Sequence, residues 1–187
     1  MKSILAVLTV CFLLSFPAPA QKSSKSSQPP PQFTQRVTRE VRHQILMLPY
    51  YSEFDVIGFK VQGYTVTLYG KVVRPSLKDD AANSIKKIEG VEHVNNQIEV
   101  LPPSPMDDRL RARLFRAIYG YSSLQRYGVG SNRPIHIIVD RGHVTLEGVV
   151  DNQADKNVAG IRANSVPGIF SVKNNLAVAP GNAKKQT

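Results

Sequence analysis

Four arginines close together in the sequence are its strongest candidates for binding a ligand. Arg109, Arg113 and Arg116 are spaced at i, i+4 and i+7, which places them on one face of a helix. Arg111 adds a fourth positive charge at the side of that face. Because each cation near an anionic membrane surface contributes about 1 kcal/mol, the four together predict reversible, salt-sensitive attachment.

The stretch that follows mixes aromatic rings with cations, a combination that suits the boundary between lipid headgroups and water. The whole candidate set for binding lipid or another anion is Arg109, Arg111, Arg113, Arg116, Tyr121, Arg126, Tyr127 and Arg133. The alternative is a solvated helix face whose arginines pair with Asp107, Asp108 and the first half of the chain, since charged stripes on helices are common.

Residues for catalysis or metal binding are not arranged for either task. No two histidines share the i, i+4 spacing of a helical metal site, and no H-E-x-x-H or G-x-S-x-G motif occurs. Gly128-Val129-Gly130 begins like a dinucleotide loop, but Arg133 stands where the third glycine belongs and a strand is expected to follow. The sequence therefore predicts a non-catalytic protein with no metal, no other cofactor and no small-molecule substrate.

The segments that position the arginines belong to one of two copies of a repeated unit. Val66-Thr67-Leu68-Tyr69-Gly70 recurs as Val144-Thr145-Leu146-Glu147-Gly148, and the same register continues without a gap through the rest of the unit. Such a repeat predicts two domains with the same fold. The matched positions that we interpret as structural are Gly70, Gly90, Asn96, Gly148, Gly168 and Asn174.

Each kind of matched residue has a structural interpretation. Gly70 lies late in a predicted strand, which indicates a bulge or the close approach of another backbone. Gly90 follows a predicted helix, at the position where a left-handed residue is expected. Asn96 interrupts the apolar face of a predicted strand, and its amide is expected to bond to nearby backbone rather than to a ligand.

Local patterns in the first copy predict the order helix, strand, strand, helix, strand. The first helix is expected to be capped by Thr34 and ended by Pro49. Strands at 54–61 and 64–73 follow, with a tight turn at Gln62-Gly63.

A second helix, capped by Ser76 with Asp79, and a third strand through 94–100 complete the first copy. A strand, helix and strand in succession require a parallel crossover. The predicted fold class is therefore α+β: two tandem α-β-β-α-β units, each a three-stranded mixed sheet with both helices packed on one face.

The second copy repeats this order after a short, proline-rich linker. Ser104 is the expected cap of its first helix, with Pro105 at the first helical position. The copy carries about five extra residues near 127–132, a turn at Arg141-Gly142, and a closing strand through 172–178. Asn152 with Asp155 repeats the cap of the second helix.

The first twenty residues have the pattern of an export signal. Lys2 precedes an apolar run at 4–16, and Ala18-Pro19-Ala20 offers the small residues of a cleavage site after Ala20. The run is shorter than the roughly 20 residues that span a bilayer. Cys11, the one cysteine, lies inside it, so the mature chain is expected to have no disulfide or thiolate site.

The formal net charge of +10 is concentrated in the second copy and at the two ends of the chain. For an exported protein this charge favours anionic envelope partners, such as phospholipid headgroups, over nucleic acid. The expected organisation is a signal peptide (1–20), a disordered linker (21–33), the first domain (34–101), a linker (102–105), the second domain (106–179) and a disordered basic tail (180–187).

The repeated motif resembles the BON domain family. The pattern V-T-L-x-G-x-V, a capped helix and G-[VI]-x-x-V-x-N-x-[IL]-x-V occurs at 66–100 and again at 144–178. The whole arrangement is similar to periplasmic proteins with two tandem BON domains, including the osmotically inducible periplasmic type. The lipid-anchored members carry a cysteine at the cleavage site, where this chain has Gln21.

This resemblance implies the α-β-β-α-β fold and a non-catalytic, periplasmic protein. Such a protein is expected to bind anionic phospholipid or envelope surfaces and to support envelope integrity or tolerance of osmotic and other envelope stress. The alternative function is a chaperone-like or protein-interaction module for envelope proteins, in which strand edges or the groove between the units hold client segments. The oligomeric state is left open.

Overall fold

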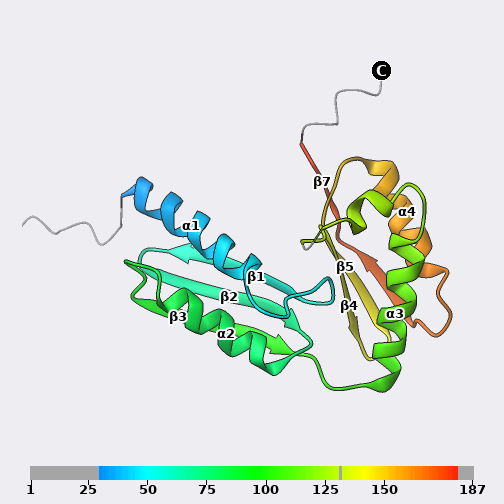
Figure 1. Ribbon diagram of the computed structural model, residues 1–187, viewed down its shortest axis with the longest axis horizontal. Helices are drawn as coiled ribbons and strands as arrows, with labels where there is room; N and C mark the ends of the chain where they lie inside the picture. The colour runs from blue at the N-terminus through cyan, green and yellow to red at the C-terminus, as the bar shows by residue number, and fades with distance from the viewer. Residues whose placement is uncertain (1–29, 131, 181–187) are drawn as a thin grey trace, which may run out of the picture.

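The computed structural model describes residues 30–130 and 132–180, which form two α+β units (Figure 1). The first unit (30–101) contains α1 (Pro31–Leu46), β1 (Val56–Gln62), β2 (Thr65–Val72), α2 (Pro75–Lys86) and β3 (His93–Val100). The second unit (104–180) contains α3 (Pro105–Tyr119), the short 3-10 helix η1 (Gln125–Gly128), β4 (Ile135–Asp140), β5 (His143–Val150), α4 (Gln153–Asn164), β6 (Ser171–Asn174) and β7 (Ala177–Val178).

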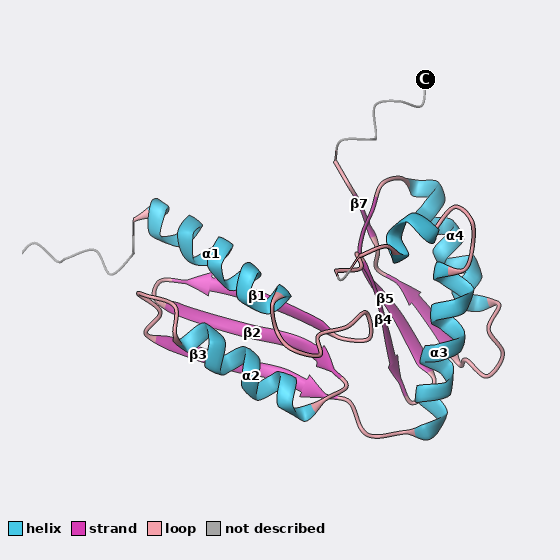
Figure 2. Cartoon of the chain, viewed as in Figure 1, coloured by secondary structure: helices cyan, strands magenta, loops and turns pink. Residues whose placement is uncertain are grey.

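Both units have the same mixed sheet, with the two helices of each unit packed on one face (Figure 2). In the first unit the strand order is β1-β2-β3; β1 runs antiparallel to β2, and β3 runs parallel to it. The second unit repeats this arrangement with β4, β5 and β6, and β7 extends the parallel pairing with β5. The predicted fold class is confirmed.

Each unit has its own apolar core. In the first unit, Val37, Val41 and Ile45 of α1 are buried against the sheet and α2. In the second, Leu110 and its neighbours on α3 occupy the equivalent positions. A helix that places every fourth residue in the core buries one stripe and leaves the opposite side in water. The free side of α3 is therefore the side available for binding.

The matched glycines have the predicted backbone roles. Gly70 has a φ of +125°, and a Cβ there would overlap the carbonyl oxygen of Val56 on the neighbouring strand. Gly148 has the same conformation against Pro134. Gly90 and Gly168 also have positive φ just beyond their helices. A side chain at Gly70 or Gly148 would push the paired strands apart.

The matched asparagines make the same two hydrogen bonds in both units. Asn96 Nδ2 donates to the carbonyl of Lys78 (2.8 Å), and its Oδ1 accepts from the Ile98 amide (3.2 Å). Asn174 bonds to the backbone in the same way, with Nδ2 to Lys156 O at 2.7 Å. These bonds fasten the closing strand of each unit to its second helix, which confirms the structural interpretation.

Several predicted helix caps and turns are confirmed. Ser104 Oγ accepts from the Asp107 amide (3.2 Å) with Pro105 as the first residue of α3. Asn152 Oδ1 accepts from the Asp155 amide (2.8 Å) at the start of α4. The second hairpin turns at Arg141-Gly142, as expected, because Asp140 pairs with His143.

Other boundaries differ from the predictions, because proline acts as the first residue of a helix. α1 begins at Pro31, not at a cap on Thr34, so residues 31–33 of the predicted disordered linker are helical. α2 begins at Pro75, and Ser76 makes no cap. Proline is favoured at the first helical position because its fixed φ suits a helix. Its missing N–H costs nothing there, since amides in the first turn have no acceptor within the helix.

Smaller differences concern strands. The first hairpin turns at Gly63-Tyr64, one residue later than predicted, because Gln62 pairs with Thr65. The closing strand of the second unit is divided into β6 and β7. The extra residues of the second unit contribute to η1. The predicted signal peptide, most of the linker at 21–33, and the tail from 181 lie outside the described residues.

The segment between α1 and β1 reaches toward β4 of the second unit and joins the units (Figure 1). The Ile137 amide donates to the carbonyl of Glu53 (2.6 Å), and Phe54 packs against the second core. Two ion pairs cross the same joint: Glu53 with Arg133 and Lys71 with Asp140, each at 2.8 Å. The joint therefore combines backbone, apolar and ionic contacts.

Candidate surface-binding site

The N-terminus of α3 is fixed to the second sheet by a buried carboxylate. Asp107 Oδ1 and Oδ2 accept hydrogen bonds from the amides of Gly142 and Arg141, each at 2.9 Å. An acidic side chain in the first turn also interacts favourably with the helix dipole. Asp107 is therefore committed to holding the helix, not to pairing with the arginines of α3.

Arg109, Arg113 and Arg116 lie on the exposed side of α3, as predicted. Arg109 Nε donates to the carbonyl of Pro105 in its own helix (3.2 Å), and Arg113 Nη1 to the carbonyl of Pro167 (3.5 Å). Within residues 30–130 and 132–180, none of the three has a carboxylate at ion-pair distance. Their charges remain available to a partner.

Arg111 does not lie on this surface, which corrects the sequence-based expectation. Only 4% of the residue is exposed. Its Nη1 donates to Asp108 (2.6 Å) and its Nη2 to the carbonyl of Val139 in β4 (2.8 Å). The residue follows Leu110 in the buried stripe, so its side chain lies against the sheet edge and satisfies a strand carbonyl there.

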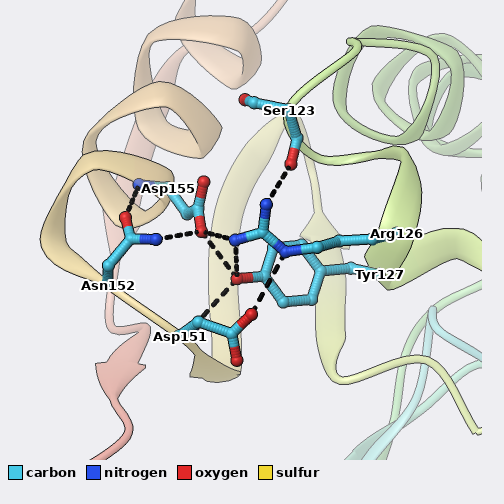
Figure 3. Close-up of polar contacts among 6 residues, drawn as sticks. All are labelled: Ser123, Arg126, Tyr127, Asp151, Asn152 and Asp155. Atoms are coloured by element: carbon cyan, nitrogen blue, oxygen red, sulfur yellow. Dashed lines mark hydrogen bonds and ion pairs between the residues drawn. The ribbon is translucent and has the colours of Figure 1, made fainter. Parts of the chain in front are cut away.

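Arg126 and Tyr127 belong to a polar network around Asp155 (Figure 3). Arg126 forms ion pairs with Asp155 and with Asp151 (3.1 Å), and its Nη2 donates to the Tyr127 hydroxyl (3.0 Å). That hydroxyl donates to Asp155 (2.7 Å) and accepts from the Asp151 amide (2.9 Å). Asn152 Nδ2 adds a further bond to Asp155 (2.8 Å).

The pKa shifts in this network follow from burial and from the hydrogen bonds within it. Burial raises the pKa of Tyr127 to about 12, and the hydrogen bond from the Asp151 amide partly offsets that effect. The hydrogen bond to Tyr127 is the main cause of the raised pKa of Arg126. Arg126 is exposed but paired with two carboxylates, and Tyr127 is buried, so the predicted pair of free side chains is instead engaged within the fold.

Arg133 is also engaged, in the joint between the units. Its guanidinium pairs with Glu53 (2.8 Å) and lies over the Phe115 ring, 5.3 Å from the centroid. Tyr119, beneath the same guanidinium, donates its hydroxyl to the carbonyl of Ile135. Burial raises the pKa of Tyr119, so the hydroxyl keeps its proton. Arg133 thus joins the units rather than facing a partner.

Tyr121 keeps its predicted exposure and gains a neighbour that local spacing did not identify. Its ring lies beneath Arg162 of α4, with 5.1 Å from the guanidinium carbon to the ring centroid. Arg162 Nε also donates to the carbonyl of Ala117 at the end of α3 (3.1 Å). Only the packing of α4 beside α3 brings this cation near the helix, so no signal within α3 could have revealed it.

The structure therefore narrows the candidate site. We call it the α3 arginine surface, and it consists of Arg109, Arg113, Arg116, Tyr121 and Arg162. Three guanidiniums without acidic partners and an amphipathic ring suit an anionic partner with an apolar layer beneath it. In the described part of the chain, no helix is both long enough and apolar enough to span a bilayer.

Comparison with protein-family models identifies the repeated unit. The BON domain model matches residues 34–102 and again residues 107–180. The chain belongs to the BON domain family. The two matches account for most of the chain, and they coincide with the two α-β-β-α-β units. BON domains are associated with membrane- and envelope-related proteins and are generally non-catalytic, and proteins of this family are typically periplasmic or envelope-associated.

Among solved structures, two matches are to CdsD, a structural protein of the type III secretion system of Chlamydia trachomatis. One has 15% sequence identity and a TM-score of 0.28, and it covers 78% of this chain and 94% of that chain. The other, the C-terminal domain of CdsD, has the same identity and TM-score with 76% and 96% coverage. The comparison with curated proteins found no match.

Proposed function

We propose that this BON protein is a non-catalytic component of the cell envelope that binds anionic phospholipid surfaces through the α3 arginine surface. Export to the periplasm, with cleavage after Ala20, and a role in envelope integrity or stress tolerance are part of the proposal. The observation that carries it is the exposure of Arg109, Arg113 and Arg116 without an acidic partner in the described chain.

The pairing of the other cations in the predicted candidate set supports this assignment. Arg111, Arg126 and Arg133 each form an ion pair with a carboxylate of the same chain, which neutralises their charge. Of that candidate set, Arg109, Arg113 and Arg116 have no carboxylate partner among the described residues, and Arg162 adds a fourth cation nearby. At about 1 kcal/mol for each cation at an anionic surface, the expected binding is reversible. It is also expected to weaken with salt, because the charges are exposed.

Vesicle co-sedimentation tests the proposal. The full chain is expected to sediment with phosphatidylglycerol vesicles at low ionic strength, to be released by added salt, and to remain in the supernatant with phosphatidylcholine vesicles. Equal binding to the two lipids, or binding that salt does not change, would contradict attachment through arginine charge.

The alternative function is a protein-interaction module, and the free strand edges of the first unit favour it. β3 forms one edge of the first sheet and is largely exposed, and no described strand pairs with its outer side. An unpaired edge is a place where an extended client segment can add a strand. Retention of an unfolded outer-membrane protein in solution without lipid would favour this function over lipid binding.

A further inference from the structure

A groove lies in the joint between the two units, beside α3 but distinct from most of its arginine surface. The cavity has a volume of about 680 Å³. On one side are Tyr50, residues 52–55 and the junction of β2 with α2, and on the other is the flank of α3 that carries Ala112 and Phe115. Its size falls within the range of roughly 300–1,000 Å³ that is typical of small-ligand sites.

The interior of the groove is largely apolar. Phe54 from the first unit and Phe115 from α3 line it and pack against each other, with ring centroids 6.4 Å apart. Val73 and Ala112 extend the apolar lining. Such a surface binds an apolar group by removing both from water, at roughly 25 cal/mol for each Å² buried.

The wall contributed by the first unit is held in place by hydrogen bonds. Asp55, only 1% exposed, accepts from the Ser52 amide (3.0 Å), the Ser52 hydroxyl (2.7 Å) and the Val73 amide (2.8 Å). The neighbouring carbonyl of Glu53 accepts from Ile137 of the second unit. The groove is therefore formed before any ligand arrives, which lowers the entropy cost of binding.

The charges around the groove leave an excess of positive groups. Each of its three carboxylates has a partner: Glu53 pairs with Arg133, Asp55 with the Ser52 and Val73 donors, and Asp108 with Arg111. Two further lining residues, Arg74 and Arg116, have no carboxylate at ion-pair distance among residues 30–130 and 132–180. Arg74 lies over the Tyr50 ring, 4.7 Å from its centroid.

Two further features of the groove lining suit an anion. The Nε of Arg111, a lining residue that is almost fully buried, has no hydrogen-bond partner. A buried donor left unpaired costs about 1–3 kcal/mol, so such a group usually marks a missing acceptor. The N-terminus of α2, which follows Arg74 directly, has no side-chain cap. A helix N-terminus attracts negative charge.

We propose that the groove binds an apolar carboxylate. The apolar part lies against the groove face that Phe54, Phe115 and Ala112 line, and the carboxylate is held by the arginines of the rim, Arg74 foremost. Two sources have this chemistry: the free C-terminus of a polypeptide with an apolar last residue, and a free fatty acid. This site goes beyond the proposed attachment to membranes, because Arg74 and the two phenylalanines lie outside the α3 arginine surface.

Isothermal titration of the full chain tests this site with three probes: an acetylated pentapeptide ending in phenylalanine with a free carboxylate, the same peptide with a C-terminal amide, and decanoate. The free-acid peptide is expected to bind at least about tenfold more tightly than the amide, because a charged hydrogen bond to Arg74 is lost in the amide. Binding of the free-acid peptide alone identifies a polypeptide end as the source, and binding of decanoate alone identifies a fatty acid.

Two variants locate the binding. Arg74→Gln is expected to weaken binding of the carboxylate probe by about tenfold, and Ala112→Phe, which fills the groove, to abolish it. Arg39→Gln, on the exposed side of α1, is the matched control and is expected to bind like the wild type. Arg74→Gln should also keep its vesicle binding, so loss of groove binding is distinguishable from loss of the proposed membrane attachment.

The site is overturned if neither carboxylate probe binds, or if the free-acid peptide binds and the amide peptide binds as tightly. It is also overturned if Arg74→Gln and Arg39→Gln behave alike. Should Ala112→Phe fail to fold, the comparison of acid with amide and of Arg74→Gln with Arg39→Gln still decides the matter, because both arginines lie on the surface.

Discussion

The first helices of the two units, α1 and α3, bury the same three positions but present different charges. Val37, Val41 and Ile45 of α1 correspond to Leu110, Leu114 and Ile118 of α3. On the exposed side, Arg36 of α1 pairs with Glu40 at 3.6 Å, and in α3 an arginine, Arg113, occupies the position of Glu40. At these two matched positions, one copy of the fold thus carries an ion pair and the other carries two arginines, Arg109 and Arg113, without an acidic partner among the described residues.

The start of the second helix shows a related difference. Leu77 of α2 is buried in the first core, and the matched residue of α4 is the buried carboxylate Asp155. The partners of Asp155 are Arg126 and Tyr127 of η1, which follows α3 in the second unit and has no counterpart helix in the first. One copy fills the position with an apolar side chain, and the other uses it to fasten an inserted loop.

Replacing Asp155 is expected to produce the largest effect on stability. Asp155→Ala leaves Arg126, the Tyr127 hydroxyl and Asn152 without their common acceptor, and should lower the free energy of unfolding by about 3 kcal/mol. Asp79→Ala, at an exposed position near the start of α2, should change it by less than about 0.5 kcal/mol. Urea unfolding of both variants measures the difference, and equal effects would mean that the network does not hold the loop.

Removing the Phe54 ring, which the first unit packs against the core of the second, should lower the free energy of unfolding and weaken the coupling between the units. Phe54→Ala is expected to cost about 2 kcal/mol, less than for a fully buried phenylalanine because Phe54 is half-buried. Calorimetry should then resolve two unfolding transitions where the wild type has one. Phe170→Ala, which removes an exposed ring, is the control. A single transition in Phe54→Ala would show that the ring does not couple the units.

The ion pair across the joint should have the smallest effect, and a pH dependence of known sign. The Lys71 ammonium lowers the pKa of Asp140, and the same hydrogen bond raises the pKa of Lys71. A lowered carboxyl pKa contributes stability above the unfolded-state pKa of about 3.9 and loses it as the pH falls through the folded value. Because the pKa of Lys71 is raised, the charged lysine contributes to the free energy of unfolding at all pH values below the ordinary lysine pKa, and this contribution is lost only as the pH rises through the folded value.

Because both partners are partly exposed, Lys71→Gln should cost only about 0.5 kcal/mol at neutral pH. The difference from the wild type should disappear in acid, once Asp140 is protonated. Urea unfolding at neutral and acidic pH checks this. A difference that grows as the pH falls would have the wrong sign for this pair.

The sequence predicted the features that repeat or that depend on local spacing. The match of Gly70 with Gly148 and of Asn96 with Asn174 correctly predicted that the two halves share one fold. Each matched residue has the same backbone conformation or hydrogen bonds in both units. The helix caps at Ser104 and Asn152 were also predictable, because each cap hydrogen bond joins residues only three positions apart in the sequence. Helix periodicity also placed Arg109, Arg113 and Arg116 on the free side of α3.

The site residues that depend on contacts between segments could not be predicted in this way. Periodicity places Arg111 beside the apolar stripe but does not reveal the strand carbonyl of Val139 that receives it. The acidic partners of Arg126 and Arg133 are Asp155 and Glu53, which are distant in the sequence. These pairs therefore become visible only in the folded structure. Arg162 joins α3 only through helix packing.

Charge reversal on α3, compared with the same reversal on α1, tests the central claim most directly. Arg109→Glu with Arg113→Glu should abolish co-sedimentation with phosphatidylglycerol vesicles at low ionic strength. Arg39→Glu with Arg42→Glu changes two exposed arginines of α1 by the same charge and should leave binding close to that of the wild type. Equal loss in both double variants would show that net charge, and not the α3 arginine surface, holds the protein to the membrane.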